Sequence, residues 1–408
     1  MNKSQVIPES LTERAPTRPP GVTYVLAAGI FLMGTTEFMI AGLLPDVAAD
    51  LDVDVARAGL LITAFAVGMI VGPPVMALVT MRLPPRTTLV VSLLVFAIGH
   101  VVGATSTSFH VVTASRVLTA LATGTFWAVA AVMALRLASP GTGARAMAVL
   151  SSGLGLAVVA GVPLGTFAGQ ITGWRGPFWI LAVLATIAAF VVRRVAPNDA
   201  IRTDISVAVA VSTVRRWRMW VVLAAIVLAQ AGFLGAYSYI TPLLTDRSGI
   251  APALVPLILV GFGIGGLLGN AVAGRTGGRY PIATIAIAVA VTSIGLAALA
   301  FWAGHPTIAA ALIVVLGASG LGANPVLIAE TMRHADGDSP LASALATAAF
   351  NLGTAGGSAV AGLTLSTSLS TSGPAVMGAV VTVTALVPIA VLTVENRRAS
   401  ARRDSPTG

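Results

Sequence analysis

Two charged residues, Glu37 and Arg116, lie inside stretches of sequence that are otherwise almost entirely apolar. A charge at the depth of a lipid bilayer is costly, so such residues commonly serve a function. Burial favours the protonated form of a carboxyl group, whereas a nearby guanidinium favours the ionised form. A carboxyl group under both influences could gain and lose a proton as its exposure to water changes. A fixed structural ion pair between Glu37 and Arg116 would use the same two residues, and the sequence does not separate the two interpretations.

The composition identifies the surroundings of these charges as a membrane. Of 408 residues, 56% are hydrophobic and 10% charged, with a mean hydropathy of +0.92. A water-soluble domain is about one quarter charged, so that class is excluded. The chain has no cysteine, which excludes disulfides, thiolate catalysis and cysteine-ligated metal sites. Nothing in the sequence requires a cofactor, a metal ion or a nucleic acid.

Apolar blocks divide the chain into twelve predicted membrane-spanning helices. Each block has about the 20 residues that a helix needs to cross a bilayer. Helices are expected because lipid cannot satisfy open backbone groups. The predicted spans lie near 22–43, 58–79, 87–104, 110–135, 146–169, 177–195, 220–243, 252–273, 281–302, 307–329, 341–366 and 374–394.

The basic residues set the predicted orientation, because positive charge concentrates on the cytosolic side. With the N-terminus inside, twenty Lys and Arg residues fall in cytosolic segments and three (Arg57, Arg175 and Arg247) in external ones. Both termini are therefore predicted to be cytosolic. The predicted organisation is a tail (1–21), a six-helix bundle (22–195), a cytosolic linker (196–218), a second six-helix bundle (219–394) and a tail (395–408).

The two predicted bundles share a sequence mark. Arg82 and Arg86 follow the second span, and Arg275 and Arg279 follow the eighth, with the same spacing of four residues. Short cytosolic loops also collect arginines for topological reasons alone. Together with the six-plus-six division, however, the repeat indicates a duplicated transporter whose substrate site lies between the halves near the midplane.

Several motifs resemble those of the major facilitator superfamily. Residues 77–86 (ALVTMRLPPR) are similar to its loop motif after span two, with Met81 where the family has an acidic residue, and residues 270–279 (NAVAGRTGGR) are a second copy. Arg116 resembles the intramembrane arginine of span four. Gly161, Pro163 and Gly165 resemble the span-five motif of drug:proton exporters, although helix packing would also explain these glycines. Residues 34–45 (GTTEFMIAGLLP) resemble span one of chloramphenicol and arabinose exporters.

This resemblance implies an all-α fold of twelve transmembrane helices in two pseudo-symmetric halves. It also implies a proton-coupling role for Glu37 and Arg116, and a role in conformational change for the loop arginines and the span-five motif. The residues predicted to line the substrate cavity are Met33, Ile40, Ala41, Thr123, Trp127, Gln230, Tyr237, Asn324 and Asn351. Intramembrane amides as often fasten neighbouring helices, and packing is the favoured interpretation for Trp127. For His100, an interfacial or packing position is favoured over a role in proton transfer.

The predicted function is proton-coupled efflux of small amphiphilic compounds, with chloramphenicol-type antibiotics as the expected substrates. Export of a sugar or nucleoside and uncoupled facilitation are the alternatives. A Gly-Ala-Ser-Gly sequence at 317–320 resembles an intramembrane protease motif, but a six-span protease does not need twelve spans, so no enzyme is predicted. The expected partners are a small-molecule substrate, protons and the bilayer, and the expected setting is a monomer in a bacterial inner membrane.

Overall fold

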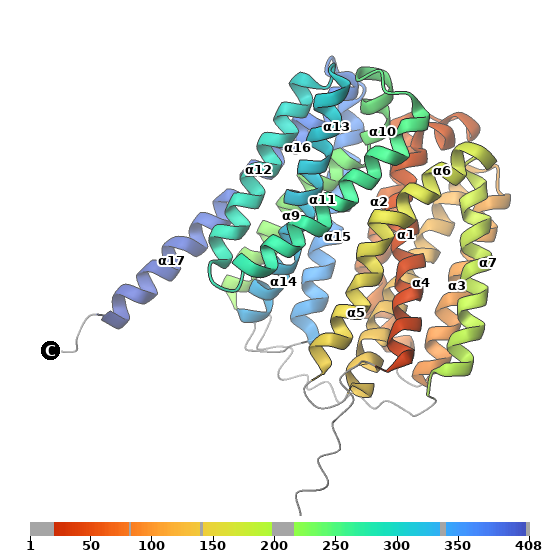
Figure 1. Ribbon diagram of the computed structural model, residues 1–408, viewed down its shortest axis with the longest axis horizontal. Helices are drawn as coiled ribbons and strands as arrows, with labels where there is room; N and C mark the ends of the chain where they lie inside the picture. Colours follow the sequence, from red (N-terminus) through yellow and green to blue (C-terminus); the bar gives the residue numbers. More distant parts are fainter. Residues whose placement is uncertain (1–19, 81–82, 139–141, 198–215, 335–339, 405–408) are drawn as a thin grey trace, which may run out of the picture.

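The computed structural model describes residues 20–80, 83–138, 142–197, 216–334 and 340–404. All regular elements in these ranges are helices, most of which run side by side through one bundle (Figure 1). The apolar blocks of the sequence form the long helices. Proline often occupies the first helical turn, as at Pro85, Pro281 and Pro306, where its fixed φ suits a helix and its missing N–H is not needed.

The first half of the chain provides six helical segments. One of them, the fifth, contains a π-helical turn (η1) between two α-helices. In chain order these elements are α1 (Gly21–Asp50), α2 (Val55–Thr80), α3 (Pro85–Thr105), α4 (Phe109–Leu137), α5 (Gly143–Leu156), η1 (Ala157–Gly161), α6 (Val162–Thr172) and α7 (Arg175–Val195).

The second half also provides six segments, four of which consist of more than one helical element. In chain order these are α9 (Trp217–Tyr237) with α10 (Ile240–Pro242) and η2 (Leu243–Arg247); η3 (Pro252–Leu254) with α11 (Val255–Thr276); α12 (Pro281–Trp302); α13 (Pro306–Leu316), η4 (Gly317–Leu321) and α14 (Asn324–Arg333); α15 (Pro340–Thr364); and η5 (Ser370–Ser372) with α16 (Gly373–Thr384) and α17 (Leu386–Asp404).

Eleven of these segments are long and apolar enough to cross a membrane within the part of the chain that the structure describes. Helix α15 completes the predicted twelve: it has 25 residues, and its many Ala, Gly, Ser and Thr residues make it less hydropathic than the others. The predicted all-α fold is confirmed. Two helices run further than predicted. Helix α1 continues to Asp50, and α17 continues through 395–404, a stretch of strong helix formers that the sequence analysis assigned to a tail.

The two halves pack against each other along two seams. Helix α2 lies against α15 in one seam, and α11 lies against η1 and α6 in the other. A Cβ added to Gly263 of α11 would come within 2.9 Å of the backbone oxygen of Val158 in η1, so this close approach requires glycine. In Figure 1, α1–α7 lie on the right and α12–α14, α16 and α17 lie on the left.

Hydrogen bonds join the halves near one end of the bundle, where Arg175 forms an ion pair with Asp50. We call it the Asp50 end. Thr241 donates to the Ala41 carbonyl oxygen (2.9 Å). The Tyr239 hydroxyl lies 3.4 Å from the Ala56 carbonyl oxygen of the first half and 3.1 Å from the Ser358 carbonyl oxygen of its own half. Gln170 donates to the Pro252 oxygen at 2.6 Å. These bonds hold the interface closed at the Asp50 end.

Candidate functional site

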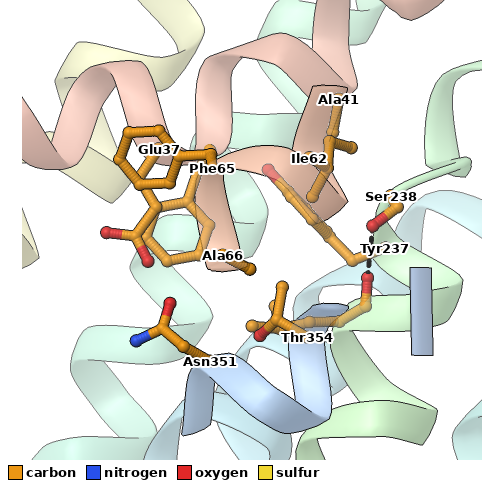
Figure 2. A pocket seen from close by; sticks show the side chains of 11 residues that line it. Glu37, Ala41, Ile62, Phe65, Ala66, Tyr237, Ser238, Asn351 and Thr354 are labelled. Carbon is orange, nitrogen blue, oxygen red and sulfur yellow. Dashed lines mark hydrogen bonds between the residues drawn. The ribbon is translucent and has the colours of Figure 1, made fainter. Parts of the chain in front are cut away.

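A narrow cavity lies between the halves, beside the middle of α1. Helices α1 and α2 supply one wall, and α9 and α15 supply the other (Figure 2). Its lining consists mainly of apolar and aromatic side chains with a few polar groups, which is the usual character of a small-molecule site. The lining residues are Glu37, Phe38, Ala41, Ile62, Phe65, Ala66, Leu234, Tyr237, Ser238, Asn351 and Thr354.

Glu37 supplies the one acidic side chain in this lining. It is half-buried near the middle of α1. Its carboxylate takes part in no hydrogen bond or ion pair with any residue that the structure describes. Figure 2 shows the Glu37 carboxylate and the Asn351 amide pointing into the same part of the cavity. The carboxylate is therefore available to a proton or to a ligand in the cavity.

Arg116 lies beside Glu37 without a direct ion pair. It is 1% exposed, its Nη1 donates to the Thr36 hydroxyl (2.9 Å), and its Nη2 donates to the Thr36 carbonyl oxygen (3.0 Å). Its guanidinium carbon lies 4.5 Å from the centre of the Phe65 ring, which lines the cavity. The positive charge is thus fixed on the residue that precedes Glu37, and it acts on the carboxylate through space.

The position of Glu37 along its helix differs from the one that the predicted span implies. The first span is predicted to end near residue 43, whereas α1 continues to Asp50. Glu37 is therefore 13 residues from the end of its helix, and Arg116 is seven residues from the start of α4. The two still meet because Arg116 reaches α1 at Thr36.

Three of the nine residues predicted to line the substrate cavity are part of its lining: Ala41, Tyr237 and Asn351. Tyr237 is 6% exposed, and its hydroxyl oxygen is buried with no hydrogen-bond partner in the described part of the chain. Its ring stacks on Phe262 with the centroids 4.6 Å apart and contacts Phe38 edge-on at 6.4 Å. Asn351 donates to the Thr347 carbonyl oxygen (2.9 Å). A role in substrate binding stays a prediction for all three.

The other six predicted cavity residues lie outside this lining. Gln230 donates to the Asn324 side-chain oxygen (2.7 Å), so these two amides join α9 to α14. Thr123 is fully buried and donates to the Thr119 carbonyl oxygen (2.8 Å). Met33 and Ile40 are fully buried in the core, and Trp127 packs against it.

Sequence reasoning did not single out most of the apolar lining. Phe38, Ile62, Phe65 and Ala66 have no distinctive type or spacing in helices that are apolar all round. Leu234 lies four residues after Gln230 and three before Tyr237, so the three share one face of α9. One signal was available for Phe38, because it follows the only acidic residue that the sequence analysis placed well inside a span.

A second, narrow and apolar cavity lies within the second half and shares the side chain of Tyr237 with the first. The rings of Phe233 and Phe262 lie on its wall, stacked with centroids 6.0 Å apart. Tyr237 therefore separates a cavity that contains a carboxylate from one that is lined by hydrocarbon and aromatic groups.

The predicted conformational motifs comprise the arginines near the start of α3, the arginines at and after the end of α11, and the span-five motif in η1 and α6. Arg82 falls outside the described residues, Arg86 is half-buried in the first turn of α3, and Arg275 and Arg279 are exposed. Of the span-five motif, Gly161 ends η1, and Pro163 is buried in the first turn of α6. Gly161 and Gly165 pack on α1, where their missing Cβ atoms leave room for Thr35 and Met39. These glycines bring the fifth segment close to α1 within the first half.

No group of three or more His, Asp or Glu side chains that could hold a metal ion occurs among the residues described here. His100 is fully buried rather than interfacial: its Nε2 lies 2.8 Å from the Thr36 hydroxyl, and its Nδ1 lies 2.8 Å from the Phe96 carbonyl oxygen.

Comparison with known proteins agrees with this architecture. The profile of the Major Facilitator Superfamily matches residues 26–254 and again residues 222–408. A chloramphenicol resistance protein of Streptomyces lividans is 39% identical over 355 residues, which cover 86% of this chain and 91% of that protein. The inner membrane transport protein YdhP of Escherichia coli strain K12 is 33% identical over 362 residues, 89% of this chain and 93% of that protein.

A third relative, the putative transporter AraJ of the same organism, is 28% identical over 346 residues, 85% of this chain and 88% of that protein. The profile matches together span the helical bundle from α1 to α17. The chain is therefore a multi-pass membrane transporter that belongs to the Major Facilitator Superfamily.

Proposed function

We propose that this transporter exports small amphiphilic compounds, chloramphenicol-type antibiotics among them, in exchange for protons. The observation that carries the proposal is the position of Glu37, whose carboxylate faces the central cavity and has no hydrogen-bond or ion-pair partner among the described residues. Such a carboxylate can bind either a proton or a hydrogen-bond donor of a substrate. Because the two compete for the same group, binding of one can release the other, as proton–substrate exchange requires.

The cavity suits a substrate with an aromatic or aliphatic body and a few polar groups. Phe38, Phe65 and Tyr237 offer ring surfaces, while the unpartnered Tyr237 hydroxyl and the Asn351 amide offer hydrogen bonds. A buried hydroxyl without a partner is costly, and a ligand that bonds to it removes that cost. The chloramphenicol resistance protein among the relatives supports this class of substrate. A sugar would need more polar groups than this lining contains.

Exchange follows from competition at Glu37. A neutral substrate with hydroxyl or amide N–H groups donates hydrogen bonds to the ionised carboxylate, so it binds better to the deprotonated protein. By linkage, protonation then weakens substrate binding by the same factor. If the N-terminus is cytosolic, as the distribution of basic residues predicts, the Asp50 end is external. An external proton would then release the substrate and favour return to the inward-facing state.

Transport by purified protein in liposomes tests the proposal. An imposed pH gradient is expected to drive uptake of radiolabelled chloramphenicol by the wild type and to drive none by Glu37→Gln, because the amide cannot carry the proton. Exchange of substrate without a gradient should persist in this variant. Full gradient-driven uptake by Glu37→Gln would overturn the proton role.

Expression in a susceptible host tests the substrate class separately. Resistance to chloramphenicol is expected, and an uncoupler that collapses the proton gradient should remove it. Resistance that survives the uncoupler would indicate a facilitator, and unchanged susceptibility would exclude chloramphenicol as the substrate.

A further inference from the structure

We propose that His100 is a positioning residue for proton coupling, and that it acts as a neutral hydrogen-bond acceptor which fixes Thr36 and, through Thr36, Arg116. The inference rests on the proposed role of Glu37 and concerns the groups that hold the charge beside it. His100 belongs to α3, Thr36 to α1 and Arg116 to α4, so the three residues join three helices in the first half of the chain.

The hydrogen bonds fix the tautomer of His100. Its Nδ1 lies 2.8 Å from the Phe96 carbonyl oxygen. A carbonyl oxygen can only accept, so Nδ1 carries the hydrogen. In the neutral ring Nε2 is then an acceptor. It lies 2.8 Å from the Thr36 hydroxyl, so that hydroxyl donates its single hydrogen to His100.

This direction leaves the lone pairs of the Thr36 oxygen for Arg116. The Nη1 group, which can only donate, lies 2.9 Å from the same oxygen, and Nη2 donates to the Thr36 carbonyl oxygen at 3.0 Å. Every hydrogen bond in the series therefore has a donor and an acceptor. The guanidinium is held by two atoms of the residue next to Glu37.

The surroundings hold His100 in one orientation. Its ring is fully buried and lies 4.2 Å from the Phe96 centroid and 5.2 Å from the Phe178 centroid. Phe178, on α7, brings no charge to the ring. The charged groups nearby come from the helices already named: Arg116 on α4 and Glu37 on α1.

A protonated His100 would break this arrangement. Its Nε2 would become a donor, so the Thr36 hydroxyl could no longer donate its hydrogen to His100. Nε2 and the Nη1 group of Arg116 would then compete for the same Thr36 oxygen. It would also place a second buried cation near the guanidinium. The network therefore keeps His100 neutral and makes it a fixed support for Arg116, while the mobile proton resides at Glu37.

Paired substitutions separate a hydrogen-bonding role from simple packing and from proton carriage. Thr36→Ser keeps the hydroxyl and Thr36→Val removes it with little change of shape. His100→Gln keeps an acceptor oxygen, whereas His100→Leu has none. Thr88→Val removes a buried hydroxyl at the start of α3 that donates to the Pro84 carbonyl oxygen just before this helix, and it serves as the matched control.

The readout is gradient-driven uptake in liposomes over a range of pH, with gradient-independent exchange measured in parallel. Thr36→Val and His100→Leu should each reduce gradient-driven uptake by about tenfold, since hydrogen bonds to charged groups are among the stronger ones. Thr36→Ser and His100→Gln should restore most of the loss, and Thr88→Val should retain uptake. The double variant Thr36→Val/His100→Leu should lose no more than either single one, because both break the same series.

Three results would overturn the inference. His100→Gln as inactive as His100→Leu would indicate that the imidazole itself carries the proton. Full coupling in both Thr36→Val and His100→Leu would exclude the positioning role. Additive losses in the double variant would indicate two separate packing defects. Failure of the proposed function appears differently: Glu37→Gln would then retain coupled transport, whatever the His100 and Thr36 variants do.

Discussion

The centres of the two halves differ in kind, although the halves repeat the same number of helical segments. In the first half, Glu37 and Arg116 lie side by side, and Thr36 and His100 hold Arg116 in place. In the second half, α9 faces the cavity with Leu234 and Tyr237, and the amides Gln230 and Asn324 bond to each other. Around the central cavity, the first half therefore contributes the charged groups, and the second half contributes only neutral ones to the lining.

This difference suggests a division of labour. Charges near the bilayer midplane are costly and need partners, so we infer that they are gathered where proton coupling requires them. The neutral residues of the second half would then determine which substrate binds. If the division holds, substitutions in the first half should alter coupling, and substitutions in the second half should alter binding or stability.

Apart from substitutions of Glu37 itself, the largest effect is expected for Arg116→Lys. The lysine keeps the charge, but a single ammonium cannot reproduce the planar pair of bonds to the Thr36 hydroxyl and carbonyl oxygen. Losing one charge-assisted hydrogen bond of roughly 2 kcal/mol corresponds to about a thirtyfold fall in the initial rate of gradient-driven uptake. Wild-type rates in this variant would show that position matters less than charge.

A smaller effect, on binding rather than coupling, is expected for Tyr237→Ala. This change removes the ring that stacks on Phe262 and lines both cavities. Aromatic contacts of about 1 kcal/mol, together with the lost apolar area, predict roughly a tenfold increase in the Kd of chloramphenicol. Tyr237→Phe keeps the ring and should change Kd by about fivefold or less, which corresponds to the net value of one hydrogen bond, about 1 kcal/mol.

Calorimetry on the two purified Tyr237 variants measures this contrast. The pH dependence of binding should persist in both, since Glu37 is unchanged. Loss of the pH dependence of binding in Tyr237→Ala would contradict the proposal that proton coupling depends on the first half alone.

Tyr239→Phe should shift the conformational balance by a few-fold. The hydroxyl lies 3.4 Å from the Ala56 carbonyl oxygen of the first half and 3.1 Å from the Ser358 carbonyl oxygen of its own half, so the contact with Ala56 joins the halves at the Asp50 end. Its loss, at about 1 kcal/mol, predicts about a fivefold increase in the population open at that end. Because the chain has no cysteine, Ala66→Cys in the cavity lining gives a single thiol reporter.

An impermeant thiol reagent applied to the Asp50 side should label this reporter faster in Tyr239→Phe than in the parent. An unchanged labelling rate would mean that the hydroxyl does not help to close this end.

The smallest functional effect is expected for Gln230→Leu. It breaks the hydrogen bond between Gln230 and Asn324, which joins α9 to α14. Bonds of this kind contribute about 0.6 kcal/mol on average within membranes. A slightly lower Tm in a thermal-shift assay is expected, with the coupling ratio of protons to substrate unchanged. A changed ratio would show that the second half also takes part in coupling.

Much of the architecture could be predicted from the sequence. Lipid restricts membrane-spanning segments to helices, and each such helix appears in the sequence as an apolar block of about 20 residues. The proximity of Glu37 and Arg116 could be predicted, because opposite charges inside a membrane stabilise each other. The contact itself could not be predicted. Arg116 donates to Thr36, and a threonine within a helix gives no sequence signal that it accepts a hydrogen bond from an arginine.

The cavity lining was harder to predict, for a physical reason. Helices that are apolar all round give no periodic signal that separates the faces toward lipid, core and cavity. Met33 and Ala41 are equally plausible in the sequence, yet Met33 is in the core and Ala41 lines the cavity. Amides are ambiguous for a related reason, because Gln230 and Asn324 satisfy each other whereas Asn351 reaches the lining.

Proton release on substrate binding tests most directly whether Glu37 exchanges a proton for substrate. Purified protein in detergent and weak buffer is mixed with saturating chloramphenicol at a pH where binding is pH-dependent, and a pH-sensitive dye reports the protons released. The wild type is predicted to release protons and Glu37→Gln to release none while still binding the drug. Equal release by both proteins, or binding without release by the wild type, would contradict the exchange of proton for substrate at Glu37.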